Sequence, residues 1–204
     1  MKKSDKTRRL IVEKSASLFN QKGFAGTSIQ DIMAATGLTK GGIYGNFKKE
    51  SGDKKGVKEE IALAAFQYAV EVVNEEVRKR TFVIENSIDK LKAVVYFYKE
   101  HLFNPPVEGG CPILNTSVEA DDNNPVLREK VLEALEYWQQ RIIITLKYGI
   151  ERGEVHPETE LGHFARLFIS TLEGGIMLSR IYKSPEPFDS VSRQLIKMID
   201  EISV

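Results

Sequence analysis

The feature that most constrains the fold is a helical spacing of apolar residues from about residue 11 to about residue 202. Apolar residues recur at intervals of three and four, which places them on one face of an α-helix. No segment shows a convincing alternation of apolar and polar residues, the pattern of a half-buried strand. We therefore expect an all-α fold with about nine helices and no internal repeat.

Residues that start and stop helices divide the first part of the chain into three short helices. Gly23 ends the first because glycine adopts a positive φ without a Cβ penalty. Thr27-Ser28 followed by Gln30-Asp31 predicts a capping box at the start of the second helix. Thr36-Gly37 predicts a turn, and Thr39 can cap a third helix.

Two short helices joined by a tight turn predict a helix-turn-helix motif, in which the third helix of the chain leaves one face free. Leu38 and Ile43 return to a small core. The free face is small and polar, a surface that allows close approach to a DNA major groove, and it consists of Thr39, Lys40, Gly41, Gly42, Gly45 and Asn46. Thr39 begins the helix where a phosphate can bind. The alternative is a three-helix core with no role in DNA binding.

The charge distribution supports the DNA-binding interpretation, although the formal net charge is zero. Residues 1–60 hold 13 Lys and Arg against 7 Asp and Glu, whereas residues 61–204 hold 16 against 22. A basic first part suits a DNA partner because Lys40, Lys48 and Lys49 can neutralise phosphates. Lys54, Lys55 and Lys58 contribute to the same excess.

The motif residues resemble the tetracycline-repressor (TetR) family of bacterial one-component regulators. The resemblance is carried by Thr27–Met33 and Gly37–Phe47, with Ile11, Leu18-Phe19 and Gly23-Phe24 fitting the family's first helix. It implies a homodimer, a double-stranded DNA operator with two-fold symmetry, and a small-molecule effector bound in a C-terminal helical domain. By analogy, phosphates are contacted by Thr27, Ser28, Tyr44, Asn46 and Lys48, and base edges by Thr39, Lys40, Gly41 and Gly42.

Two departures from the family pattern stand out. Met33 occupies a position that is usually alanine, and we expect the packing of the two short helices to shift around it. The start of the family's fourth helix is matched by Lys58–Ile61, eight residues later than expected. We therefore predict a DNA-binding domain at 1–47, an inserted exposed loop at 48–57, and a ligand-binding and dimerisation domain at 58–204.

The helix expected at about residues 158–182 has two apolar rows, so one row can cover its own domain and the other a second copy. With the last helix, at about 188–202, it predicts a dimer interface with two-fold symmetry. The predicted interface consists of Leu161, Phe168, Leu172, Gly174, Gly175, Ile176, Val191, Leu195 and Ile199. The alternative is that both rows fill the core of one chain.

Aromatic residues with a few polar neighbours suit a pocket for a small organic molecule. The predicted ligand contacts are Tyr96, Phe97, His101, Cys111, Asn115, Trp138, Phe164 and Phe168. These aromatics can equally fill the core, as we expect above all for Trp138 and Phe168. Cys111 is either an inert buried thiol or a sensor of oxidants and electrophiles.

Other classes of protein are excluded by what the sequence does not contain. A single cysteine allows no internal disulfide, and no apolar run reaches the roughly 18 residues of a membrane span. Only Glu160–His163 fits a Glu-x-x-His motif, so we expect no metal site, no cofactor and no enzymatic activity. We predict a cytoplasmic, ligand-responsive transcriptional repressor. The alternative is a helical small-molecule-binding or enzymatic protein with a vestigial DNA head.

Overall fold

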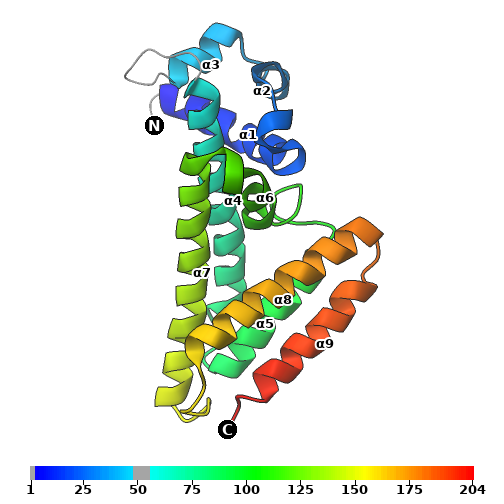
Figure 1. The fold of residues 1–204 in the computed structure, drawn as a ribbon. Coiled ribbons are helices and arrows are strands. Elements are labelled where there is room, and N and C mark those ends of the chain that lie inside the picture. The colour runs from blue at the N-terminus through cyan, green and yellow to red at the C-terminus, as the bar shows by residue number, and fades with distance from the viewer. Residues whose placement is uncertain (1–2, 48–55) are drawn as a thin grey trace. The chain divides into compact units, whose positions relative to one another are not determined.

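The structure, a computed structural model, describes residues 3–47 and 56–204 (Figure 1). These residues form nine helices, and their only β-type pairing is an isolated bridge between Val155 and Ser203. The helices are α1 (Lys3–Gly26), α2 (Ile29–Thr36), α3 (Lys40–Asn46), α4 (Gly56–Thr81), α5 (Ser87–Glu100), α6 (Pro112–Asn123), α7 (Pro125–Glu151), α8 (Leu161–Tyr182) and α9 (Glu186–Asp200). The predicted all-α class is confirmed.

The described residues pack into two compact units. Unit 1 takes its residues from 1–73 and 107–132, and unit 2 consists of residues 74–106 and 133–204. The first part of α4 and the first part of α7 therefore belong to unit 1, and the remainder of each helix belongs to unit 2. This division by packing differs from the predicted division by role at residues 47 and 57, which stays a prediction. None of the helices in the described residues is both long and apolar enough to cross a membrane.

The core of unit 1 joins the three N-terminal helices to the start of α4. Its buried side chains are Ile11, Ile32, Ile43, Phe47, Val57 and Ile61. Val57 is therefore a core residue, and Gly56 beside it is also buried within α4. The predicted exposed loop is wrong at these two positions because the apolar Val57 side chain is drawn into the core. Its other residues, 48–55, lie outside the described part of the chain.

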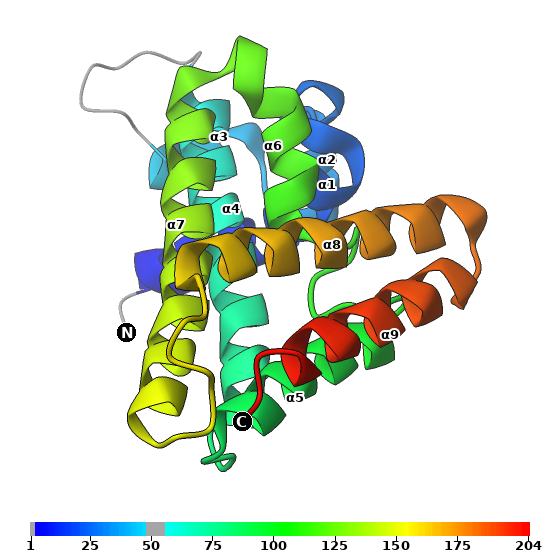
Figure 2. The ribbon, with the colours of Figure 1, turned by 60° about the horizontal axis from the view of Figure 1, so that its bottom comes forward.

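The core of unit 2 is formed mainly by α5, α7, α8 and α9. Helices α8 and α9 lie side by side in both views of the ribbon, and α5 lies along α9 (Figures 1 and 2). Phe168, Leu172, Leu195 and Ile199 are fully buried in this core. The Phe188 amide donates a 2.8 Å hydrogen bond to the Ser179 hydroxyl, which joins the end of α8 to the start of α9.

Candidate nucleic-acid interface

The turn from α1 into α2 is built around Gly23 and Thr27. Gly23 has a φ of 74°, a conformation that side-chain-bearing residues rarely adopt, and the helix direction changes there. The Thr27 hydroxyl donates a 2.8 Å hydrogen bond to the Gly23 carbonyl. Thr27 is only 1% exposed, so its side chain closes the end of α1. The Thr27 hydroxyl therefore faces the inside of the unit, and the predicted phosphate contact at Thr27 stays a prediction.

The predicted capping box at the start of α2 is confirmed. The Asp31 amide donates to the Ser28 hydroxyl at 3.1 Å, and the Ser28 amide donates to the Asp31 carboxylate at 2.8 Å. The Lys22 ammonium lies 2.8 Å from the other carboxylate oxygen. The bond from Lys22, followed by those from Ser28, lowers the pKa of Asp31 well below its usual range. Asp31 thus binds the end of α1 to the start of α2.

The turn between α2 and α3 also has its predicted form. Gly37 has a φ of 68°, and its amide donates to the Met33 carbonyl at 2.9 Å, which ends α2. Thr39 then caps α3 by accepting a 3.2 Å bond from the Gly42 amide. Ile32 and Ile43 are fully buried on either side of this turn. The two helices therefore form a helix-turn-helix.

The outward face of α3 is small and polar. Thr39, Lys40, Gly41 and Gly45 are exposed. A Cβ added to Gly45 would meet nothing within 4 Å, so no intramolecular contact requires glycine there. An interior helical glycine is about 1 kcal/mol less favourable than alanine. The glycines therefore lower the stability of α3, and they leave its outward face without protruding side chains. Such a face lets the edge of a base pair approach the helix backbone.

Arg8 holds the far end of α3 in place, a role that the sequence analysis missed. Its guanidinium donates to the Asn46 carbonyl at 2.8 Å and lies 4.0 Å from the centre of the Phe47 ring. It also binds the Glu60 carboxylate of α4 at 3.1 Å. A cation at a helix C-terminus satisfies a carbonyl that lacks an intrahelical partner. No sequence signal links Arg8 to residues 38 and 52 positions away.

The remaining predicted DNA contacts fall into three groups. Gly42, Tyr44 and Asn46 are half-buried, with the Lys40 ammonium 5.7 Å from the centre of the Tyr44 ring. Ser28 is half-buried and carries the capping box. Lys48 lies outside the described residues. All of the predicted DNA contacts stay predictions.

One basic residue of the N-terminal charge excess faces the inside of unit 1. The Lys58 ammonium lies 4.3 Å from the centre of the Phe24 ring. Burial lowers the pKa of Lys58, and the nearby charge of Glu119 opposes that effect. The positive charge of Lys58 therefore interacts with Phe24 and Glu119 inside unit 1.

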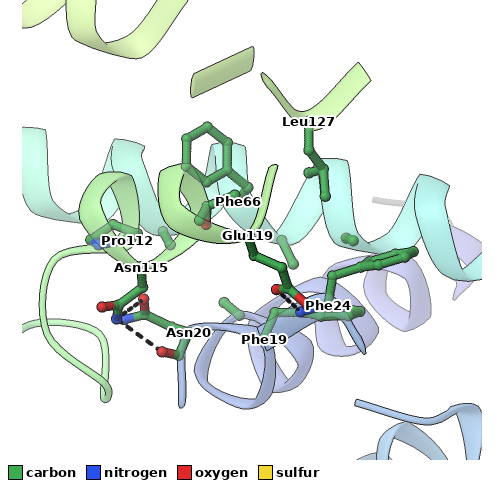
Figure 3. Close-up of a pocket in the computed structure, with 13 residues that line it drawn as sticks. Phe19, Asn20, Phe24, Phe66, Pro112, Asn115, Glu119 and Leu127 are labelled. Carbon is green, nitrogen blue, oxygen red and sulfur yellow. Dashed lines mark hydrogen bonds between the residues drawn. The ribbon is translucent and has the colours of Figure 1, made fainter. Parts of the chain in front are cut away.

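A small cavity lies in unit 1 between α1, α4, α6 and the start of α7 (Figure 3). Its volume is about 20 Å³, room for about one water molecule. Phe19, Phe24 and Phe66 line it together with the polar side chains of Asn115 and Glu119. An organic ligand would fit only if the surrounding helices moved apart.

The predicted ligand contacts are not brought together in this cavity, and only Asn115 lines it. Phe164 and Phe168 are buried in the core of unit 2, as expected above all for Phe168, and their ligand contacts stay predictions. Cys111 is buried at the start of α6, in unit 1.

The other four predicted contacts lie on α5, at its C-cap His101 and on α7, all in unit 2, and they differ in exposure. Phe97 is buried and stacks on His101, with ring centres 4.4 Å apart. Trp138 stacks on Tyr98 at the edge of the core, and Tyr96 is exposed.

Most residues of the predicted dimer interface lie on the inward faces of α8 and α9. Its buried members fill the core of a single chain, and they are Phe168, Leu172, Gly175, Ile176, Leu195 and Ile199. Leu161 and Val191 are half-buried against that core. The burial of these residues within one chain fits the alternative that they fill the core, and the predicted interface stays a prediction. Gly174 is half-exposed, and a Cβ added to it would meet nothing within 4 Å.

The outward face of α8 carries the second apolar row. Its exposed large side chains are Leu167, Met177, Leu178, Ile181 and Tyr182. Ser170 and Gly174 lie between them on the same helix. Because both residues are small, the helix surface is lower at these positions than at the flanking apolar side chains. Several large apolar side chains exposed on one helix face often mark an interaction site.

The geometry of α1 to α3 defines a helix-turn-helix protein of the class that regulates transcription by binding DNA. Residues 11–50 match the family "Bacterial regulatory proteins, tetR family", and residues 87–195 match "Tetracyclin repressor-like, C-terminal domain". The second match covers more than half of the chain. The protein belongs to the TetR family of transcriptional regulators.

Relatives over the whole length agree with this assignment. A TetR transcriptional regulator from Chloroflexus aurantiacus J-10-FL superposes with a TM-score of 0.91 at 41% identity, covering 100% of this chain and 98% of the other. A TetR-family regulator from Cytophaga hutchinsonii has a TM-score of 0.88 at 35% identity, with the same coverage. The transcriptional repressor DhaR of Mycobacterium sp. (strain GP1) is 25% identical over 89% of this chain and 86% of its own. These relatives are regulators and not enzymes, so the enzymatic alternative is not favoured.

Proposed function

We propose that the protein represses transcription as a homodimer on a DNA operator with two-fold symmetry, and that a small-molecule effector releases it. The observation that carries the proposal is the outward face of α3, which combines an exposed cation, Lys40, with the exposed glycines Gly41 and Gly45. This face can enter a major groove, while Thr39 places the start of α3 where a phosphate can bind. The relative DhaR is a transcriptional repressor, which supports repression over activation.

The outward face of α8 supports the homodimer. Its apolar row runs from Leu167 to Tyr182, and its small residues Ser170 and Gly174 allow a second helix to approach closely. A second copy would present the same face, which is the requirement of a two-fold interface. Two DNA-binding heads related by such an axis match an operator of the same symmetry.

The dimer can be tested by sedimentation of the full chain at micromolar concentration. Ile181 is 78% exposed, so Ile181→Glu places a charge on the α8 face without disturbing the core. We expect a dimer for the unaltered protein and a monomer for the variant. Phe82 is exposed outside α8, and Phe82→Glu is the matched control that should remain dimeric. A monomer in the unaltered protein would contradict the proposed dimer.

The DNA contacts can be tested by comparing two lysines. Lys40 lies on the outward face of α3, so Lys40→Ala is expected to change which sequences bind. Lys48 follows α3 in the chain, and Lys48→Ala is expected to weaken binding to all sequences alike and to lower the salt dependence. If both variants act uniformly on every sequence, α3 does not lie in the groove as proposed.

An effector releases DNA only to the extent that it prefers a conformation that binds DNA poorly. Candidate effectors can be screened by the loss of binding to a fluorescent operator duplex. A compound that releases the duplex and is recovered unchanged supports the proposal. A compound that is chemically converted would instead favour an enzymatic role for the helical body.

A further inference from the structure

Helix α6 binds α1 through two side chains on the same face. Asn115 and Glu119 are four residues apart on α6, and their partners Asn20 and Phe24 are four residues apart on α1 (Figure 3). The Asn115 amide group donates to the Asn20 carbonyl at 3.0 Å and to its side-chain oxygen at 2.9 Å. All four residues belong to unit 1.

The contact made by Glu119 is bidentate. One oxygen of the Glu119 carboxylate accepts from the Phe24 amide, and the other accepts from the Ala25 amide at 2.6 Å. These amides follow Gly23, where the direction of the helix changes, and they begin a new helical turn. Amides at such a position lack intrahelical partners and lie at the positive end of the turn. A carboxylate is the group best suited to bind them.

The Glu119 carboxylate lies directly against the Cα of Gly23, in the space that a side chain would occupy. A Cβ added to Gly23 would lie 2.6 Å from Oε2 of Glu119, closer than non-bonded atoms approach. Gly23 is therefore constrained twice, by its φ of 74° and by the carboxylate that lies against it. The contact lies beside the Phe24 ring, which stacks on Phe19 and packs under the Lys58 ammonium.

We propose that Glu119 is a positioning residue for DNA binding, which holds the turn from α1 into α2 from a helix outside the helix-turn-helix. The turn that it holds continues directly into the capping box at Ser28, which begins α2. When the carboxylate is withdrawn, the turn loses the acceptor of two amides, and the orientation of α2 and α3 on α1 is no longer fixed. A displacement of α6 therefore loosens the DNA-binding motif. This inference rests on the proposed DNA-binding function.

The sign of the expected effect separates this role from simple electrostatics. Removing a negative charge from a DNA-binding protein strengthens its attraction to phosphates. Glu119→Gln keeps the size of the side chain but replaces one accepting oxygen by an amide NH2 group, which donates and cannot accept from a backbone amide. We expect it to weaken DNA binding about tenfold, which corresponds to about 1.4 kcal/mol. The salt dependence of binding should stay unchanged because no phosphate contact is lost.

Asp122 provides the matched control because it is an exposed acidic residue on the same helix. Asp122→Asn removes the same charge three residues further along and leaves the Glu119 contact in place. We expect this variant to bind DNA as tightly as the unaltered protein, or somewhat more tightly. The probes are a duplex enriched from a random pool by the unaltered full-length protein and a random-sequence duplex of equal length.

Hydrogen exchange of the folded proteins gives a second measurement that does not depend on DNA. In Glu119→Gln the amides of Phe24, Ala25 and α2 should exchange at least tenfold faster, while those of α9 in unit 2 stay as they are. If Glu119→Gln does not fold, Glu119→Asp withdraws the carboxylate by one methylene group and retains the charge. It should lose DNA affinity in the same direction.

The outcomes distinguish the inference from the function on which it rests. Weaker binding by Glu119→Gln but not by Asp122→Asn, with an unchanged salt dependence, supports the positioning role. Equal binding by Glu119→Gln and the unaltered protein overturns it and leaves the proposed function standing. If the unaltered protein binds no duplex in a salt-dependent manner, the proposed function fails, and the inference fails with it.

Discussion

Arg8 on α1 and Glu60 on α4 form an ion pair in which two guanidinium nitrogens lie 3.1 and 3.2 Å from the same carboxylate oxygen. The same guanidinium binds the last carbonyl of α3, that of Asn46. The pair therefore links the start of α4 to the end of the helix that we place in the major groove. A seven-residue helix with three glycines needs such external support.

Replacing Arg8 with lysine tests this support. Lysine keeps the charge but cannot bind Glu60 and Asn46 together through a planar fork. We expect α3 to lose about 1 kcal/mol of stability, because exposed pairs and cation–π contacts each contribute up to about that amount. The α3 amides should exchange faster, and DNA binding should weaken about fivefold at an unchanged salt dependence.

The control for Arg8 is its neighbour Arg9, which pairs with Glu13 on its own helix. Arg9→Lys should leave the exchange of the α3 amides unaltered. If Arg8→Lys instead keeps α3 protected and weakens binding, Arg8 acts by touching DNA and not by supporting α3.

The glycines of the α2–α3 region are expected to respond in opposite ways to alanine. Gly45→Ala should stabilise the protein by up to about 1 kcal/mol, because the helix gains propensity and the new Cβ meets nothing within 4 Å. It should nevertheless weaken DNA binding, because the Cβ projects from the face that approaches the groove. Gly37→Ala should destabilise the protein by about 1 kcal/mol because φ is 68°. Thermal unfolding and binding to an enriched duplex measure both effects. DNA binding that is unaltered by Gly45→Ala would place this face away from the DNA.

Adjacent glycines on α8 form a second matched pair. A Cβ on Gly175 would lie 2.8 Å from Cγ1 of Val191, so Gly175→Ala should destabilise unit 2 by about 1–3 kcal/mol through overpacking. A Cβ on Gly174 meets nothing within 4 Å in one chain, so Gly174→Ala should not destabilise the protomer. Denaturant unfolding checks the difference. Equal destabilisation by both substitutions would contradict the packing of α8 on α9.

The stability of the α1–α2 corner is expected to fall in acid. The Lys22 and Ser28 bonds lower the pKa of Asp31 in the folded state. A carboxyl group with a lowered folded pKa contributes stability above its unfolded pKa of about 3.9, and that contribution is lost as the pH falls through the folded pKa. The protection of the α2 amides, taken relative to the intrinsic exchange rate at each pH, should therefore fall progressively below about pH 4. Asp31→Asn should exchange faster at neutral pH and show less change on acidification; an identical acid response would remove Asp31 as the cause.

Local signals in the sequence predicted the helix-turn-helix correctly. Gly23, Gly37 and Thr39 have the conformations and caps expected of them, and Ser28 with Asp31 forms the expected box. These features depend on contacts between residues a few positions apart, and such contacts can be recognised from spacing. The spacing of apolar residues likewise predicted the helices of both units.

Features that depend on tertiary packing could not be predicted in the same way. Both rows of α8 are apolar, so the pattern does not decide that Phe168 faces the core and Leu167 faces outward. Arg8 and Glu119 act on residues 38 and 95 positions away, and nothing in their neighbourhood in the sequence identifies those partners. Val57 lies in a charged segment, yet it is a core residue.

Selection of DNA from a random pool by the full-length protein tests the central claim most directly. We predict enrichment of one sequence with two-fold symmetry, with half-site centres one helical turn or a multiple of it apart, and binding that weakens steeply as salt is raised. Enrichment of no sequence, or binding that does not respond to salt, would contradict the account of this protein as a dimeric operator-binding repressor.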